Sequence, residues 1–150
     1  MKILLSLILQ KRGSPTGPGA DLLRGYLERA ARYTPCELKI FPTEARLLEF
    51  LSDTTARTRP ALLLADSRGQ QVSSPELAAT IGALQDAGTQ QIVFAIGPAD
   101  GWSPAALARA DRTVAFGRVT LPHELAAVVA AEQIYRALTI RGGHPYHSGH

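Results

Sequence analysis

Residues 91–110 read QIVFAIGPADGWSPAALARA, and no other stretch of the chain says more about its architecture. The opening QIVFAI is a short apolar run with β-branched and aromatic residues, which is typical of a buried strand. A glycine-containing loop follows. Ser103 and Pro104 then begin a helix that we expect to end near Ala110. A strand, a loop and a helix in immediate succession form the repeating unit of a parallel α/β sheet.

The same alternation continues in both directions along the chain. Before residue 91 we expect strands at residues 2–9, 37–41 and 61–65, and helices at 20–33, 43–52 and 74–88. After residue 110 we expect a short strand at 113–116 and a final helix at 122–139. No internal repeat or interdomain linker is visible. The sequence therefore predicts a single α/β domain over residues 1–150, with a mostly parallel sheet flanked by helices.

The composition is that of an ordinary globular domain. Of the 150 residues, 45% are apolar and 19% are charged, so we expect a buried core rather than disorder. A formal net charge of +3 is compatible with an RNA partner but too mild to require one. Cys36 is the only cysteine, so no intrachain disulfide can form and a reducing cytosol fits.

The amino-terminal run MKILLSLIL allows two interpretations. It superficially resembles a signal peptide, but Gln10-Lys11-Arg12 stands where a small-residue cleavage site would be expected. A buried first strand is the favoured interpretation. No apolar run approaches the ~20 residues needed to span a bilayer, so we expect a cytoplasmic protein without a membrane partner.

The final helix and the tail after it concentrate side chains that can carry chemistry. Glu132 and Arg136 lie one helical turn apart and are expected to project from the same exposed face. By themselves they fit a solvated ion pair equally well. The tail adds further polar and aromatic side chains, namely Arg141, His144, Tyr146, His147 and His150. Three histidines at every third residue could chelate a metal, but no cysteine or acidic ligand lies nearby, so we expect no metal site.

Alanines make much of the surface of this helix small. Small side chains allow another backbone to approach closely, either within the chain or across a homodimer. The residues alone leave both arrangements open. The alanines concerned are Ala126, Ala127, Ala130, Ala131 and Ala137.

Three loops that follow predicted strands are candidates for a ligand site. They start at Ala65, Gly97 and Gly117, and open α/β sheets gather their ligands at that edge. Glycines there let a ligand lie against the main chain. Residues 10–19 are also glycine-rich, but they lack the Gly-Lys-Ser/Thr ending of a Walker loop, so we do not expect a nucleoside triphosphate.

These loops and the tail resemble motifs of the RlmH family, SPOUT-class methyltransferases that modify a pseudouridine of bacterial large-subunit ribosomal RNA. In the loops, ADSRGQQVSS (65–74) resembles L-D-x-x-G-K-x-x-S-S, IGPADGWS (96–103) resembles I-G-G-P-E/D-G-L/W-S, and FGRVTL (116–121) resembles S-L-S-x-L/M-T-L/F. Towards the end of the chain, TLPH (120–123), EQIYRA (132–137) and HPYH (144–147) resemble T-x-P-H, E-Q/S-x-Y-R-A and H/E-x-Y-H. The resemblance spans most of the chain and is strong from Ala65 onward.

The resemblance implies a SPOUT fold with a C-terminal trefoil knot and S-adenosyl-L-methionine as the cofactor. It also implies a homodimer in which the tail of one protomer helps to complete the site of the other. The implied activity is methylation of N3 of a pseudouridine in 23S ribosomal RNA, as free RNA, in the large subunit or in the assembled ribosome. The implied cofactor-binding residues are Ala65, Gly97, Pro98, Phe116, Gly117, Arg118, Val119, Thr120 and Leu121.

The resemblance also implies catalytic roles for Glu132, Arg136, His144, Tyr146 and His147. An imide nitrogen must lose its proton to attack a methyl group well, and His147 or His144 is expected to accept that proton. Arg136, oriented by Glu132, is expected to stabilise charge on the adjacent carbonyls. The ring of Tyr146 is expected to stack on a base.

Two positions depart from the family pattern. Pro98 stands where the family has a second glycine, and it lacks a backbone N–H that could contact the cofactor. Ala65 stands where the family usually has leucine. Two alternatives therefore stay open: a ribosome-associated RNA-binding protein of the same fold without methyl transfer, and a methyltransferase with another RNA target.

Overall fold

The central strands are buried on both faces. In β1 (Lys2–Ile8), Ile3 and Leu5 belong to one core, whereas Leu4 belongs to a second core on the opposite face. The residues of β4 (Gln91–Ile96) divide between the two cores in the same way. Neither face of these strands meets water, which is why their sequences read as continuous apolar runs, as parallel strands commonly do.

The computed structural model describes the chain apart from residues 11–12, 54, 56, 99 and 149–150. Five strands pair in the order β2-β1-β4-β3-β5, and every described pair is parallel. The other elements are β2 (Cys36–Phe41), β3 (Ala61–Gln71), β5 (Arg112–Ala115), α1 (Pro18–Ala30), α2 (Glu44–Leu51), α3 (Ser74–Asp86), α4 (Pro104–Arg109), α5 (His123–Arg141) and the 3₁₀ helix η1 (Pro145–His147).

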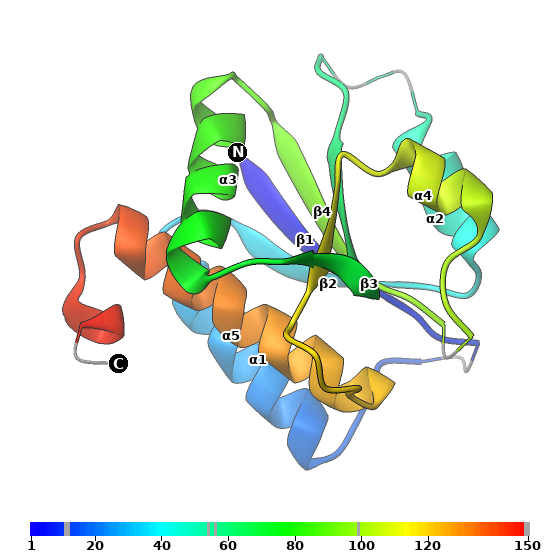
Figure 1. Ribbon diagram of the computed structural model, residues 1–150, viewed down its shortest axis with the longest axis horizontal. Coiled ribbons are helices and arrows are strands. Elements are labelled where there is room, and N and C mark those ends of the chain that lie inside the picture. Colours follow the sequence, from blue (N-terminus) through cyan, green and yellow to red (C-terminus); the bar gives the residue numbers. More distant parts are fainter. Residues whose placement is uncertain (11–12, 54, 56, 99, 149–150) are drawn as a thin grey trace.

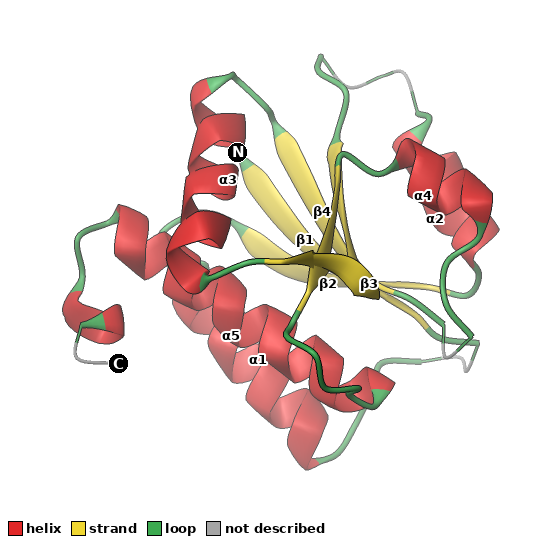
Figure 2. Cartoon of the chain, viewed as in Figure 1, coloured by secondary structure: helices red, strands yellow, loops and turns green. Residues whose placement is uncertain are grey.

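Helices cover both faces of the sheet. Helices α1, α3 and α5 pack on one face, and α2 and α4 pack on the other (Figures 1 and 2). Helices α1 and α5 lie side by side along their lengths. The predicted α/β fold with a parallel sheet flanked by helices is therefore confirmed, whereas the trefoil knot stays a prediction. Within the described residues, no helix has the length and apolar character that crossing a membrane requires.

Most helix boundaries follow local chemical signals. The hydroxyl of Ser103 accepts a hydrogen bond from the backbone N–H of Ala106 and so caps α4. Ser73 and Glu76 form a reciprocal capping box at the start of α3, and Gly88 ends that helix with a φ of 84°. The predicted helix at 20–33 is displaced: α1 begins earlier, at Pro18, and ends at Ala30.

Strand β3 is longer than predicted. We expected a strand at 61–65 followed by a loop, but β3 continues to Gln71 and pairs with β5 on both sides of an irregularity between Ala65 and Gln70. A Cβ atom on Gly69 would lie 2.8 Å from the carbonyl carbon of Thr113, so the two backbones approach more closely than a side chain allows. Glycine at this position lets the strand resume its pairing beyond the bulge.

Candidate active site

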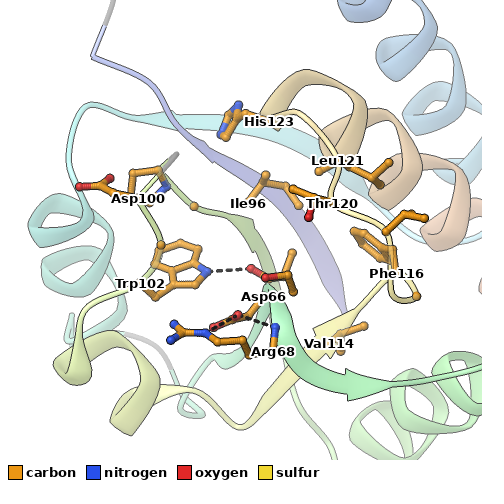
Figure 3. A pocket seen from close by; sticks show the side chains of 18 residues that line it. Asp66, Arg68, Ile96, Asp100, Trp102, Val114, Phe116, Thr120, Leu121 and His123 are labelled. Atoms are coloured by element: carbon orange, nitrogen blue, oxygen red, sulfur yellow. Dashed lines mark hydrogen bonds and ion pairs between the residues drawn. The ribbon is translucent and has the colours of Figure 1, made fainter.

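A cavity of about 360 Å³ opens beyond the carboxyl ends of β4 and β5 and beside residues 65–68 of β3 (Figure 3). The three loops that were predicted to bind a ligand contribute to its walls. All the predicted cofactor-binding residues line it except Arg118, whose side chain is exposed. Those that do are Ala65, Gly97, Pro98, Phe116, Gly117, Val119, Thr120 and Leu121.

Trp102 joins two of these loops, a role that we did not predict. Its indole Nε1–H donates to the carbonyl oxygen of Ala65 at 2.8 Å, and the side chain is buried in the cavity wall (Figure 3). The ring also lies against Gly97, where a Cβ atom would be only 2.6 Å from its Cε2. Glycine at 97 is therefore required for the indole to occupy this place.

Two further glycines shape the cavity through their backbone angles. Gly101 has a φ of 89° and Gly117 a φ of 97°, a region that residues with a side chain rarely adopt. At these turns the main chain itself forms part of the wall. A ligand can therefore be held by backbone groups, which leave little trace in a sequence.

The cavity also contains polar side chains that the sequence did not single out. Asp66 accepts hydrogen bonds from its own loop, through the backbone N–H of Arg68 at 2.9 Å, and Arg68 extends towards solvent at the rim. His123 lies in the wall at the start of α5 (Figure 3). Its Nε2 is buried and has no hydrogen-bond partner among the described residues, so a polar ligand group is a natural partner for it.

The predicted catalytic residues form a second cluster. Arg136 contacts Oε1 of Glu132 twice, through Nη2 at 2.6 Å and Nε at 2.8 Å. Tyr146 donates its hydroxyl to the same oxygen at 3.1 Å, and Nη1 of Arg136 lies 3.1 Å from Nδ1 of His147. The expectation of an exposed pair is wrong, because the side chains of Glu132 and Arg136 are only 17% and 18% exposed.

The returning tail is what covers this pair. The ring of Tyr146 packs edge-on against Tyr135 with their centroids 4.6 Å apart, and the guanidinium of Arg136 lies 4.8 Å from the Tyr146 ring centroid. Burial and the hydrogen bond to Glu132 raise the pKa of Tyr146 to about 12. At neutral pH Tyr146 is therefore a protonated phenol that donates a hydrogen bond, and it cannot serve as a base.

Both described tail histidines use their Nδ1 atoms within the protein. His147 Nδ1 faces Arg136, which has only N–H groups to offer, and His144 Nδ1 accepts from the backbone N–H of Tyr146. Each neutral ring then carries its proton on Nε2. His150, the third histidine considered as a metal ligand, lies outside the described residues, and within the described part of the chain no three potential ligands gather.

The cavity and the tail cluster are separated within one chain. His123 and Ala126, on the first turn of α5, line the cavity, whereas Arg136 lies near the other end of this helix (Figure 1). Thirteen helical residues at a rise of 1.5 Å each place them about 20 Å apart along the axis. The fold therefore assembles each predicted set of residues but does not bring the two sets together.

The fold and the cavity define a class of protein: an α/β protein with a cavity at the carboxyl edge of its parallel sheet. Residues 1–147 match the family described as predicted SPOUT methyltransferases, and the chain belongs to this family. It is 50% identical over 125 residues to ribosomal RNA large subunit methyltransferase H of Koribacter versatilis, covering 83% of this chain and 85% of that protein. The protein of that name from Geobacter metallireducens is 42% identical, over 81% of this chain and 84% of its own. The resemblance to the RlmH family is thus confirmed.

A solved structure supports the fold independently of close sequence similarity. A probable methylase family protein from Haemophilus influenzae superposes with a TM-score of 0.57 at 9% sequence identity. The match covers 98% of this chain and 70% of that one. It supports the assignment of the fold.

Proposed function

We propose that this protein is an S-adenosylmethionine-dependent methyltransferase that modifies large-subunit ribosomal RNA, at N3 of a pseudouridine in the 23S molecule. Membership of the SPOUT methyltransferase family supports methyl transfer. The names of its relatives support the large-subunit RNA as the substrate. The observation that carries the proposal is the cavity, because it is lined by the loop residues at which the family resemblance places the cofactor.

The cavity suits S-adenosylmethionine. Its volume, its apolar wall of Trp102 and Phe116, and its exposed backbone at Gly101 and Gly117 fit an adenine held by main-chain groups. The unpartnered Nε2 of His123 supplies a polar contact. When bound, the cofactor supplies a methyl group activated by a sulfonium, and such a transfer depends mainly on in-line positioning of the nucleophile.

The departures from the family pattern leave the cavity intact. Ala65 contacts Trp102 through its backbone carbonyl, which the loss of a leucine side chain does not alter. Pro98 lines the cavity together with Gly97 and Gly101, and its carbonyl accepts a hydrogen bond from the backbone N–H of Gly101 at 3.0 Å. No contact within the described residues favours an RNA-binding protein without methyl transfer, so we retain the methyltransferase proposal alone.

The tail cluster is proposed to act on the target base. Arg136, held by two contacts to Glu132, directs a permanent positive charge towards the carbonyl oxygens beside N3 and stabilises the charge left when the imide proton departs. We propose His147 or His144 as the acceptor of that proton. The Nδ1 lone pair must first be released when RNA binds, by Arg136 in the case of His147 and by the backbone N–H of Tyr146 in the case of His144. Tyr146 is proposed to stack on a base through its remaining face.

A homodimer is proposed because, within one chain, the cofactor cavity and the tail cluster lie too far apart to act on the same base. The separation of about 20 Å along α5 is too long for a methyl transfer, whose reacting atoms lie within about 3.5 Å. If the tail of one protomer reaches the cavity of its partner, both sets meet. A cytoplasmic location follows from ribosomal RNA as the proposed substrate.

Nucleoside mass spectrometry tests the proposal. The protein and S-adenosylmethionine are incubated with ribosomal particles from a strain that lacks this methylation, and N3-methylpseudouridine is quantified. Arg136→Ala is expected to lower the rate on the order of a hundredfold, since it removes a charge that stabilises the transition state. Arg141→Ala serves as the matched control, because the guanidinium of Arg141 lies over Gly82 and reaches the exposed carboxylate of Asp86 at 3.5 Å, with no hydrogen bond to the tail cluster among the described residues. A different methylated nucleoside would identify another RNA target, and equal, mild effects of both variants would contradict the role of Arg136.

A further inference from the structure

A hydrogen bond between helices α3 and α5 extends the tail cluster to a residue far from it in sequence. The hydroxyl of Ser74, the first residue of α3, donates to Oε1 of Gln133 at 2.6 Å. Nε2 of Gln133 in turn donates to Oε2 of Glu132 at 2.7 Å. The amide orientation follows from this arrangement, because a carboxylate can only accept and so must face the amide nitrogen.

The two oxygens of Glu132 have separate partners. Oε2 is held by Gln133, whereas Oε1 receives Arg136 and Tyr146. A rotation of the carboxylate about its last torsion would displace the guanidinium that it orients. That torsion is soft, so a second, independent anchor on Oε2 is needed to fix it.

The contact between Glu132 and Gln133 requires an outside support. Adjacent helical residues point about 100° apart and do not normally face each other. Packing does not hold the amide in this direction either, because Ser74 and Gln133 both line a second cavity, of about 260 Å³. The hydrogen bond from the Ser74 hydroxyl holds the Gln133 amide in the orientation in which its nitrogen faces Glu132.

We propose that Ser74 and Gln133 are positioning residues for methyl transfer, which fix the carboxylate of Glu132 and, through it, the guanidinium of Arg136. This inference rests on the proposed function. Neither residue needs to touch the RNA base or the cofactor. Neither residue lines the cofactor cavity, although Phe116 lines both that cavity and the second cavity beside Ser74 and Gln133. We therefore expect their effect to lie in the geometry of the tail cluster.

The test compares kcat and KM for S-adenosylmethionine in purified variants. Gln133→Met keeps the length of the side chain but removes both hydrogen bonds. Ser74→Ala removes the hydroxyl that donates to Gln133. Each is expected to lower kcat on the order of tenfold with KM for the cofactor unchanged, since the cofactor cavity is not altered. The double variant is expected to be no slower than either single variant, because the two residues act in series. Ser74→Thr, which restores the hydroxyl, is expected to recover most of the activity.

Thr80→Ala provides the control for a lost hydroxyl on the same helix. Thr80 donates only to the carbonyl of Glu76, one turn earlier, and its removal is expected to leave kcat unchanged. The thermal unfolding temperature of every variant is also measured. A variant that is slow but unfolds at the wild-type temperature has a misplaced tail cluster and not an unfolded chain. The inference is overturned if the wild type is active and Ser74→Ala and Gln133→Met keep its kcat, or if Ser74→Thr is as impaired as Ser74→Ala. An inactive wild type would overturn the proposed function and this inference with it.

Discussion

Gly97 shows how one missing side chain shapes the cavity. Trp102 can lie against the main chain at this point only because no Cβ atom is present, and from there its N–H reaches the carbonyl of Ala65. The indole thus ties the loop after β4 to the end of the regular part of β3. This contact connects two of the segments that line the cavity.

Gly97→Ala is therefore expected to weaken cofactor binding. The new Cβ atom would lie 2.6 Å from the indole, which must move and give up its hydrogen bond. We expect the affinity for S-adenosylmethionine, measured by isothermal titration, to fall on the order of tenfold, the cost of about one hydrogen bond. Gly25→Ala in α1 is the matched control, because nothing lies within 4 Å of its Cβ position. It should leave the affinity unchanged and stabilise the helix by about 1 kcal/mol. Equal affinities of both variants would contradict the role assigned to Gly97.

Individual site residues could be predicted from the sequence only where they belong to a recognisable motif. The loop glycines that line the cavity and the tail residues of the second cluster were predicted in this way. The role of Trp102 was not, since its partner lies 37 positions earlier in the chain and becomes a neighbour only through the pairing of β3 with β4. Arg118 sits inside a matching motif, yet its side chain does not line the cavity.

At the scale of elements, features set by neighbouring residues could be predicted from the sequence, whereas features set by contacts between distant residues could not. The starts of α3 and α4 were predictable because a serine cap bonds within its own first turn. The extension of β3 was not, because it depends on pairing with β5 more than forty residues later. The burial of Glu132 was also missed, since it results from a tail that folds back over the helix.

The tail and the cavity are separable elements, and this leads to a prediction. Removal of residues 142–150 takes away Tyr146 and His147 but no residue that lines the cavity. We expect the shortened protein to bind S-adenosylmethionine with nearly unchanged affinity in a titration and to transfer no methyl group to ribosomal RNA. Full transfer by the shortened protein would contradict the catalytic role of the tail. Loss of cofactor binding would show that the two elements are coupled.

At the scale of the whole molecule, α5 acts as a spacer with one functional cluster near each end. His123 lies at its first residue and Arg136 near its end, on a helix that is packed against α1 and α3 along its length. A rigid helix cannot bend its two ends together, which is why we propose that a second copy of the chain completes the site. From the sequence, the small side chains along α5 were compatible both with packing inside the chain and with packing across a homodimer. Most of them are buried within the chain, in the core shared with α1 and α3.

Mixing two inactive variants tests this account most directly. Gly97→Val is expected to displace Trp102 and so disable the cavity while sparing the tail, whereas Arg136→Ala is expected to disable the tail while sparing the cavity. In an equimolar mixture that exchanges subunits, half of the dimers contain one chain of each kind, and one of their two sites combines an intact cavity with an intact tail. Transfer to ribosomal RNA is then expected to recover to about a quarter of the wild-type rate, as a closed two-fold dimer requires. A mixture of demonstrated heterodimers that stays as inactive as its two components would contradict a site shared between chains.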